Sequence, residues 1–215
     1  MITRVLIVDD HPAVREGLAL RISSQPDLEV CGEAADEAEA LELLAAARPD
    51  VAVVDIQLKH GDGLQLVRRI KARSSSIGIL VWSIFSDKAY AERALNAGAL
   101  GFINKQQATD KVVGAIRCVR EGRLYLGEET AQRLLTRSVV GRPGRGQSPI
   151  HSLSDRELEV FRLIGDGLST NQVARRLHIS PHTVETHRER IKEKLGLTTA
   201  GELNYAAILW VLQGE

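Results

Sequence analysis

The chain has 215 residues, of which 44% are hydrophobic and 26% charged, and its 28 basic and 28 acidic side chains cancel. This is the composition of an ordinary globular protein, long enough for one or two cores. It excludes a uniformly basic nucleic-acid binder, because residues 1–136 hold 17 basic and 19 acidic side chains and residues 151–215 hold 8 and 9. A DNA-binding surface would therefore depend on local placement of charge.

The N-terminal stretch MITRVLIVDD contains an apolar run of only four residues, Val5 to Val8. That is too short for a signal peptide or a membrane span. Cys31 and Cys118 lie far apart inside apolar patterns, which predicts buried, reduced thiols. We therefore expect a cytoplasmic protein with no membrane partner.

The first 120 residues alternate short β-branched runs with amphipathic segments. This alternation indicates parallel strands with helices on both faces of the sheet. The central runs are apolar at consecutive positions, as in strands covered on both faces. We predict a flavodoxin-like, doubly wound, five-stranded α/β domain of order 2-1-3-4-5 over residues 1–121. Its strands are expected at 4–8, 28–32, 51–55, 77–82 and 100–104, and its helices near 12–23, 36–47, 63–73, 87–97 and 108–121.

Residues 122–152 are predicted to form a helical extension and a flexible linker. The segment 127–136 has the pattern of a short helix. The segment 137–152 is rich in Gly, Pro, Ser and Arg, and such a composition cannot build a core.

Residues 153–215 contain no strand pattern and predict a small all-α helix-turn-helix domain. Ser154 with Glu157 three residues later is a capping box, and Pro181 suits the first position of a helix. Helices are expected over 154–167, 169–178, 180–196 and 199–213. The third would expose His182, His187, Arg188, Lys192 and Lys194 over a core of Val173, Ala174, Leu177, Ile179, Val184, Ile191 and Leu195. On charge alone, a helical protein-interaction module is an alternative.

Five polar residues follow the strands of the predicted sheet: Asp9, Asp10, Asp55, Ser83 and Lys105. Each alone has an ordinary explanation as a cap, a turn residue or a solvated side chain. Because the carboxyl ends of parallel strands share one edge, we expect all five to converge there. Clustered carboxylates call for a hard cation such as Mg²⁺, and a neutralised carboxylate can attack phosphorus. Lysine and serine can then hold phosphoryl oxygens.

These residues resemble the receiver domain of two-component response regulators, through the motifs VDDH (8–11), VVDIQLKHGDG (53–63), WS (82–83) and GFINK (101–105). The resemblance implies that Asp55 is the phosphoacceptor and that Ser83 and Lys105 hold the phosphoryl group. It implies Mg²⁺ binding by Asp10, Asp55 and the backbone carbonyl of Gln57, with Asp9 acting through water. Phe102 falls at the aromatic switch position, although a plain core aromatic is an equal alternative.

Two positions depart from that family pattern. Lys59 stands where many receivers have Pro, which should loosen the loop and place a cation near the crevice. Ile84 occupies a place that is often small, which should narrow access. Neither departure removes a chemical group.

The stretch LSDRELEVFRLIGDGLSTNQVARRLHISPHTVETHRERIKEKLG resembles the LuxR-type helix-turn-helix, and together the two domains resemble the NarL/FixJ class of response regulators. By family position, the groove-facing residues are Glu185, Thr186, Arg188 and Glu189, and the candidates for phosphate contacts are Thr170, Asn171, Thr183 and Lys192. Glu185 stands where Lys is common; it weakens attraction to DNA but can accept a hydrogen bond from cytosine N4.

The last helix carries apolar residues at helical spacing, which form either core or a dimer face: Leu203, Ala206, Ala207, Trp210 and Val211. The resulting prediction is a transcriptional regulator that a sensor histidine kinase phosphorylates, that binds promoter DNA as a homodimer, and that is no enzyme beyond its own phosphorylation and dephosphorylation. One rival is a phosphohydrolase with an Asp nucleophile, against which Gln57 occupies the place of the usual general acid. The other rival binds DNA constitutively and uses its receiver only for protein contacts.

Overall fold

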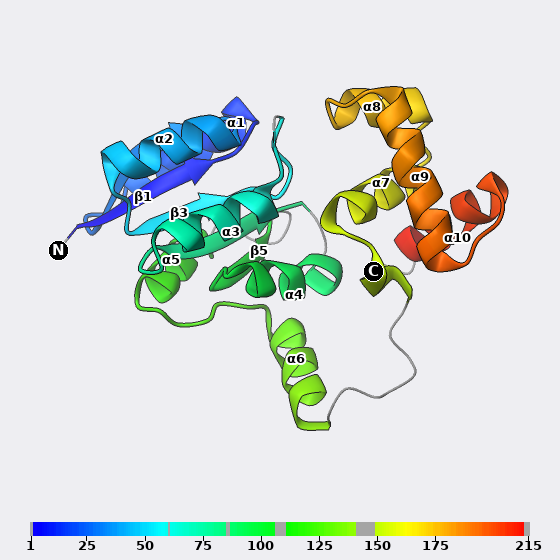
Figure 1. The fold of residues 1–215 in the computed structure, drawn as a ribbon. Helices are drawn as coiled ribbons and strands as arrows, with labels where there is room; N and C mark the ends of the chain where they lie inside the picture. The colour runs from blue at the N-terminus through cyan, green and yellow to red at the C-terminus, as the bar shows by residue number, and fades with distance from the viewer. Residues whose placement is uncertain (1, 60, 85–86, 106–110, 141–148, 213–215) are drawn as a thin grey trace. The chain divides into compact units, whose positions relative to one another are not determined.

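The computed structural model of the chain describes residues 2–59, 61–84, 87–105, 111–140 and 149–212 (Figure 1). The chain divides into two compact units, residues 1–134 and 135–215. We describe each unit by itself.

The first unit is built on a parallel sheet of order β2-β1-β3-β4-β5, which confirms the predicted topology. The β-branched runs form the strands because their side chains pack well on a pleated surface buried on both sides. The second strand extends two residues further than predicted, and the third ends one residue before Asp55. The strands are β1 (Thr3–Val8), β2 (Leu28–Ala34), β3 (Val51–Val54), β4 (Gly78–Ser83) and β5 (Gly101–Asn104).

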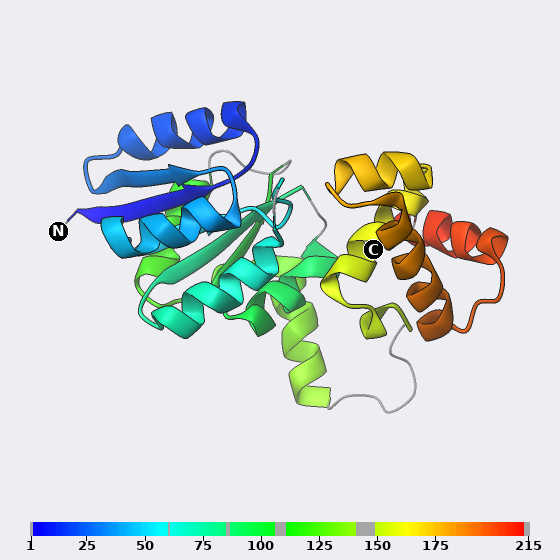
Figure 2. The ribbon, with the colours of Figure 1, turned by 45° about the horizontal axis from the view of Figure 1, so that its top comes forward.

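Helices cover both faces of this sheet, and Figure 2 shows α1 on one side of the strands with α2 and α3 on the other. One core joins alternate strand residues such as Val5, Ile7 and Leu80 to α1 and α5. The start predicted for α5 at residues 108–110 lies outside the described residues. The helices are α1 (Pro12–Ser23), α2 (Glu37–Ala47), α3 (Gly63–Arg73), α4 (Asp87–Ala97) and α5 (Val112–Arg120).

The chain after α5 returns to the free edge of β5. The Tyr125 N–H donates to the Leu100 carbonyl at 2.9 Å, and the Phe102 N–H donates to the Tyr125 carbonyl at 3.0 Å. Helix α6 (Glu128–Val140) follows and runs four residues beyond the predicted helix, so residues 137–140 are not part of a linker. The predicted linker residues 141–148 lie outside the described residues, and Pro149–Ser152 form a 3-10 turn, η1.

The second unit is helical, with the predicted helices in place. Ser154 and Ser169 form capping boxes with Glu157 and Gln172, and Ser180 caps the third helix. These caps satisfy N–H groups that a helix start leaves unpaired, which explains why the helices begin where the sequence indicates. The helices are α7 (Asp155–Gly165), α8 (Thr170–Arg176), α9 (Pro181–Leu195) and α10 (Ala200–Leu212).

The small core of this unit corrects part of the sequence interpretation. The predicted core is buried except for Ile179 and Leu195, which are partly exposed. His187 is not an exposed residue of α9: it is half-buried, its Nδ1 makes no hydrogen bond among the described residues, and burial lowers its pKa. On α10, Leu203, Ala207 and Trp210 belong to the core, and Trp210 packs against Phe161 with ring centroids 5.7 Å apart.

The structure also bears on the predictions about the cysteines and about membrane-spanning helices. Cys31 and Cys118 are free thiols, as predicted, but they are half-buried rather than buried. Cys31 lies on β2, an edge strand of the sheet, whose middle residues are covered less completely than those of the central strands. Among the described residues no single helix is long and apolar enough to cross a membrane; α9 and α10 pass that test only as a pair bent by 79°.

Candidate functional site

The carboxyl ends of β1 and β3 bring two aspartates together. Val8 pairs with Val54 in the parallel ladder, and the Asp55 N–H donates to the Val8 carbonyl at 2.8 Å. Asp9 and Asp55 are therefore the next residues of two neighbouring strands, and only 2% of each side chain is exposed. The register of the sheet therefore buries two carboxylates side by side, where little water reaches them to screen their mutual repulsion.

Lys105 offsets part of the negative charge of this pair. Its backbone N–H donates to the Ser83 carbonyl at 2.7 Å, which ties the ends of β5 and β4 together. Its Nζ lies 2.6 Å from Asp9 Oδ2 and 2.6 Å from Asp55 Oδ2. Ser83, the last residue of β4, is fully buried at the same edge. Four of the predicted site residues therefore meet at one place in the structure.

Burial and charge oppose one another at this pocket. Burial raises the pKa of Asp55 to about 6, an effect that Lys105 opposes and Asp9 reinforces. Burial alone would lower the pKa of Lys105, but Asp55 and Asp9 together hold it above its ordinary value. The pocket thus keeps an ammonium ion between two carboxylates, and a change at either carboxylate is transmitted to the lysine.

The acidic residues fit a hard cation. Asp9, Asp10, His11 and Asp55 offer ligand atoms within 4.8 Å of one another. Asp10 Oδ1 is buried and accepts no well-aligned hydrogen bond among the described residues; the group near it is the His11 imidazole, with Nδ1 at 2.7 Å. Carboxylate oxygens of this kind are the protein ligands that Mg²⁺ prefers.

His11 is a member of this cluster that the sequence analysis did not assign. Its Nδ1 lies 2.7 Å from Asp10 Oδ1 and 3.3 Å from Asp9 Oδ1, and its backbone N–H donates to Asp9 Oδ1 at 2.9 Å. The sequence held one signal for this position. His11 directly follows two aspartates and directly precedes Pro12, the first residue of α1, so its side chain stays near the two carboxylates.

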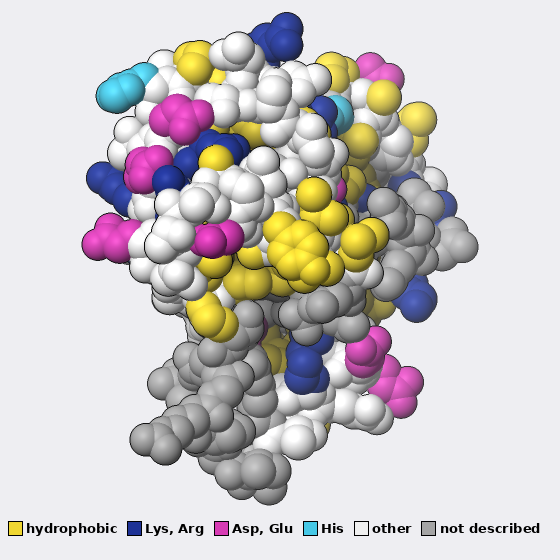
Figure 3. Space-filling view, turned by 90° about the vertical axis from the view of Figure 1, so that its right-hand side faces the viewer, with side chains coloured by type: hydrophobic (Ala, Val, Ile, Leu, Met, Phe, Trp, Pro, Cys, Tyr) yellow, Lys and Arg dark blue, Asp and Glu magenta, His cyan; other side chains and the backbone are white. Residues whose placement is uncertain are grey.

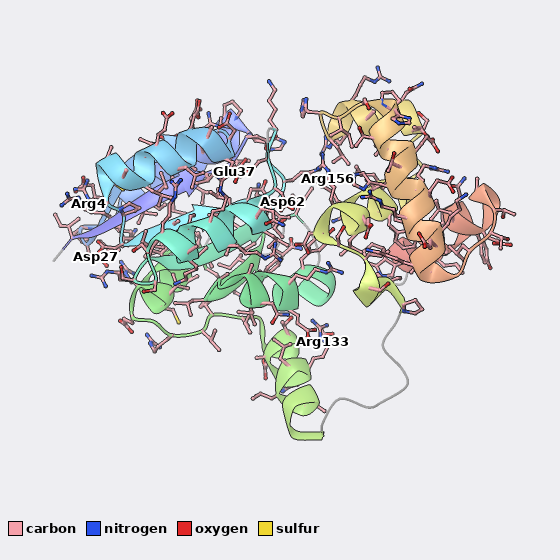
Figure 4. The ribbon with its side chains drawn as sticks, viewed as in Figure 1. Arg4, Asp27, Glu37, Asp62, Arg133 and Arg156 are labelled. Carbon is pink, nitrogen blue, oxygen red and sulfur yellow. The ribbon has the colours of Figure 1, made fainter. Side chains whose placement is uncertain are left out.

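The loop after Asp55 is held by the start of α3. A Cβ at Gly63 would lie 2.0 Å from the Asp55 carbonyl oxygen, so only glycine fits there. Asp62, labelled in Figure 4, caps α3 by accepting from the Leu64 and Gln65 N–H groups. The Gln57 N–H donates to Asp55 Oδ1 at 3.3 Å. Glycine at position 63 is therefore required by the close approach of the Asp55 backbone. Lys59, in the same loop, is exposed.

Phe102 lies in β5 three residues before Lys105, and its side chain is buried. Since side chains alternate along a strand, it points to the opposite face from Ile103, which packs with α1 and α5. Ile84 is partly exposed at the pocket side of β4. Burial suits both meanings that the sequence left open for Phe102, the core residue and the switch.

In the helical unit, the predicted DNA contacts form pairs on α8 and α9. The Thr170 hydroxyl donates to Glu185 Oε1 at 2.7 Å, and Arg188 Nε lies 3.6 Å from Glu185 Oε2. Lys192 Nζ lies 3.0 Å from Glu189 Oε1. Thr183 contacts the cap Ser180, and the Thr186 hydroxyl donates to the His182 carbonyl at 3.0 Å. The basic side chains of α9 are thus largely paired with its glutamates.

The turn between α8 and α9 borders an open groove of about 770 Å³. It is lined by Asn171, Ala174, Arg175, His178, Ile179 and Pro181. His178 has a φ of 51°, the left-handed conformation that reverses the chain between the two helices. Asn171, a predicted phosphate contact, is exposed at this groove.

An ion pair between the buried Glu157 and the partly exposed Lys194 holds α9 against α7. Glu157 accepts from the Ser154 N–H at 2.7 Å and from Lys194 Nζ at 2.6 Å. Arg156, labelled in Figure 4, donates to Glu159 at 2.6 Å and to the Leu177 carbonyl at 2.7 Å, which secures the end of α8. Lys194 is exposed, as the sequence predicts, and its ammonium group also joins α9 to α7 through Glu157.

Two family models match the chain, one over most of each predicted domain. Residues 5–117 match the response regulator receiver domain, and residues 151–205 match the bacterial regulatory proteins of the luxR family. The chain belongs to the NarL/FixJ family of response regulators.

Curated relatives of this response regulator match it over nearly its whole length. GacA of Pseudomonas aeruginosa is 32% identical over 205 residues, covering 95% of each chain. LiaR of Bacillus subtilis is 34% identical over 195 residues, covering 91% of this chain and 92% of its own. Two domains in this order are therefore shared with characterised response regulators.

Solved structures agree with the response-regulator fold. The response regulator ChrA of a heme-sensing two-component system is 33% identical, with a TM-score of 0.52 over 98% of each chain. RcsB of Salmonella enterica serovar Typhimurium, bound to the promoter P1flhDC in the presence of the phosphomimetic BeF3-, is 25% identical, with a TM-score of 0.64, covering 96% of this chain and 98% of its own.

Proposed function

We propose that Asp55 accepts a phosphoryl group from the phosphohistidine of a sensor histidine kinase. In this proposal residues 1–121 form the receiver, residues 153–215 form the DNA-binding domain, and residues 122–152 connect them. The observation that carries the proposal is Lys105 Nζ, 2.6 Å from both Asp9 Oδ2 and Asp55 Oδ2 at the carboxyl edge of the sheet. Because the ammonium group of Lys105 contacts both aspartates, a phosphoryl group on Asp55 would offer it a new negatively charged partner.

In the transfer step, an Asp55 carboxylate oxygen attacks the phosphorus of the donor. The new oxygen–phosphorus bond forms as the phosphorus–nitrogen bond breaks, and its electron pair returns to the donor imidazole. Lys105 then pairs with a phosphoryl oxygen, and the Ser83 hydroxyl donates to another. Phe102 would follow this shift on β5 as the switch aromatic.

Asp10, Asp55 and the Gln57 carbonyl would hold Mg²⁺, with Asp9 acting through water. The bound ion offsets the negative charge that gathers as the phosphoryl group meets these carboxylates. The close grouping of the Asp9, Asp10 and Asp55 carboxylates, and a buried Asp10 Oδ1 that accepts no well-aligned hydrogen bond among the described residues, support this assignment. His11 lies beside Asp10 and would orient that carboxylate.

The helical domain is proposed to bind promoter DNA through α9, with Asn171, Thr170, Thr183 and Lys192 near the backbone and Glu185, Thr186, Arg188 and Glu189 near the bases. Two-fold DNA sites call for symmetric dimers. Figure 3 shows hydrophobic side chains gathered on the face that lies at the right of Figure 1, where α10 lies. The exposed large hydrophobic residues of α10 are Tyr205, Ile208, Leu209 and Leu212. We assign the homodimer contact to them rather than to the buried Leu203, Ala207 and Trp210.

The RcsB structures support this reading, since one is described as bound to a promoter and another as two dimers on two DNAs. A regulator of this kind would act in the cytoplasm. The phosphohydrolase rival lacks an acid at Gln57, and we assign no turnover beyond the phosphorylation and dephosphorylation of Asp55.

The test is electrophoresis on a gel that retards phosphoproteins, after incubation with acetyl phosphate and Mg²⁺. Wild-type protein should shift, Asp55→Asn should not, and the control Asp166→Asn, at an exposed carboxylate of the helical unit, should shift like wild type. An unshifted wild type contradicts phosphorylation control, and a shifted Asp55→Asn places the acceptor elsewhere. Multiple turnover of a phosphate ester would restore the phosphohydrolase.

A further inference from the structure

Glu185 is an acidic residue held in place on the helix that is proposed to enter DNA. Its Oε1 accepts the Thr170 hydroxyl of α8 at 2.7 Å, and its Oε2 lies 3.6 Å from Arg188 Nε. Arg188 in turn lies 3.4 Å from Asn204 Oδ1 of α10. Residues of three helices therefore fix the direction of a carboxylate that remains 52% exposed.

The neighbouring cations are poorly placed to replace it as base readers. Only 12% of the Arg188 side chain is exposed, and its guanidinium is engaged with Glu185 and Asn204. Only 17% of Lys192 is exposed, and it pairs with Glu189. Of Glu185, Arg188 and Lys192, the side chain most accessible to a partner is therefore the Glu185 carboxylate.

The phosphates repel a carboxylate in the major groove. A hydrogen bond that the carboxylate accepts from a base can offset this repulsion. The groove offers two kinds of donor, the N6 amino group of adenine and the N4 amino group of cytosine. Adenine N6 stands beside the N7 acceptor, whose lone pair repels a carboxylate, whereas cytosine N4 stands beside a C5–H. An ionised, oriented Glu185 therefore selects cytosine.

We propose that Glu185 is a specificity-determining residue that reads one cytosine in each half-site, and that Thr170 and Arg188 are its positioning residues. This inference rests on the proposed DNA binding. It gives Thr170 a task different from the phosphate contact, and Arg188 a task different from the base contact, that family position assigns to them.

The experiment selects duplexes from a library with randomised base pairs, using the full chain treated with acetyl phosphate and Mg²⁺. Wild type should enrich one C·G pair in each half-site. Glu185→Gln should change that pair to A·T, because an amide can pair with both N6 and N7 of adenine, with a preference change of about fivefold or more. The control Glu193→Gln removes the same charge from an exposed site of α9 and should leave the motif unchanged.

Thr170→Val keeps the shape of the side chain and removes its hydroxyl. It should reduce discrimination at that one base pair and leave the other positions intact, and Thr170→Ser should restore it. Thermal melting of each variant confirms that α8 and α9 are folded.

The outcomes separate the two proposals. An identical motif for wild type and Glu185→Gln overturns the cytosine assignment while DNA binding stands. An equal loss of affinity for every sequence in Thr170→Val puts Thr170 on a phosphate and overturns its positioning role. Enrichment of no duplex by wild type overturns the proposed DNA binding, and the cytosine assignment with it.

Discussion

The pocket at the sheet edge and the surface of α9 use the same residue types in opposite ways. Asp55 and Lys105 are buried together, whereas Glu185 and Glu189 face solvent beside Arg188 and Lys192. Water is excluded from the first group and screens the second, so charge–charge energies are large in the pocket and small on the helix. The strength of a charge pair in this protein is therefore set by how deeply both of its members are buried, and not by the pairing distance alone.

The largest effect should come from Lys105→Met, which leaves Asp9 and Asp55 facing each other without a cation. Removing one partner of a buried pair costs about 3 kcal/mol, so the receiver should lose that much stability at pH 7.5. Urea unfolding followed by the fluorescence of Trp82, in a Trp210→Phe background, measures it. Lys111→Met, at an exposed lysine, is the control, and an equally small loss in both variants would contradict the comparison.

Asp55→Asn should instead stabilise the receiver at neutral pH. Because the pKa of Asp55 is raised to about 6, the folded state holds this proton more tightly than the unfolded state. Stability therefore falls as pH rises from about 4 to about 6 and stays lower above that range. The amide avoids this loss, so we expect a gain of about 2 kcal/mol at pH 7.5 that vanishes near pH 4. Urea midpoints across pH test it, and a variant less stable than wild type at pH 7.5 refutes it.

A smaller effect is expected for Lys194→Met in the helical unit. Burial would raise the pKa of Glu157, but hydrogen bonds from Lys194 and Ser154 lower it overall. The stability from Glu157 is present above its unfolded pKa and is lost as pH falls through its folded pKa. Since Lys194 is partly exposed and Ser154 remains, the loss should be about 1 kcal/mol.

Trp210 fluorescence during urea unfolding measures that loss, in a Trp82→Phe background. The double variant with Glu157→Gln should recover part of the stability, because the amide carries no charge. A loss as large as that of Lys105→Met would remove the distinction between the two units.

The smallest effect should follow Arg117→Ala. Arg117 donates to both carboxylate oxygens of Asp27, at 2.7 and 2.6 Å, at the edge of the sheet where β2 begins. Figure 4 labels Asp27 there. Both side chains are in water, so we expect no change in the urea midpoint beyond error. A clear decrease in the urea midpoint would show that a well-aligned ion pair stabilises this protein even where it is exposed to water.

Much of the pocket could be predicted because it depends on local patterns. Asp9, Asp55 and Lys105 come directly after apolar strands, and a parallel sheet brings such positions to one edge. His11 and Gly63 were not found in the same way. The role of His11 depends on how α1 starts, and the need for glycine at 63 depends on the Asp55 backbone lying against it.

The helical unit divides in the same way. The starts of α7, α8 and α9 could be predicted because a cap bonds to an N–H group only three residues away. The capping residues are Ser154, Ser169 and Ser180. The apolar face of α10 was ambiguous, since a helix that is apolar all round carries no periodic signal for which side is buried. Packing of Trp210 against Phe161 decides that face, and it turns Tyr205 and Leu212 outward.

By itself, the sequence determined the order of strands and helices, the caps and the residues at the strand ends, because each follows from neighbours a few positions apart. Three contacts depend instead on tertiary packing: the lysine bridge from Asp9 to Asp55, the Thr170–Glu185 hydrogen bond and the Glu157–Lys194 ion pair. Their partners lie 96, 15 and 37 residues apart for Lys105–Asp9, Thr170–Glu185 and Lys194–Glu157. Such distances are closed by packing of whole elements, which fixes where each side chain points and how much water reaches it.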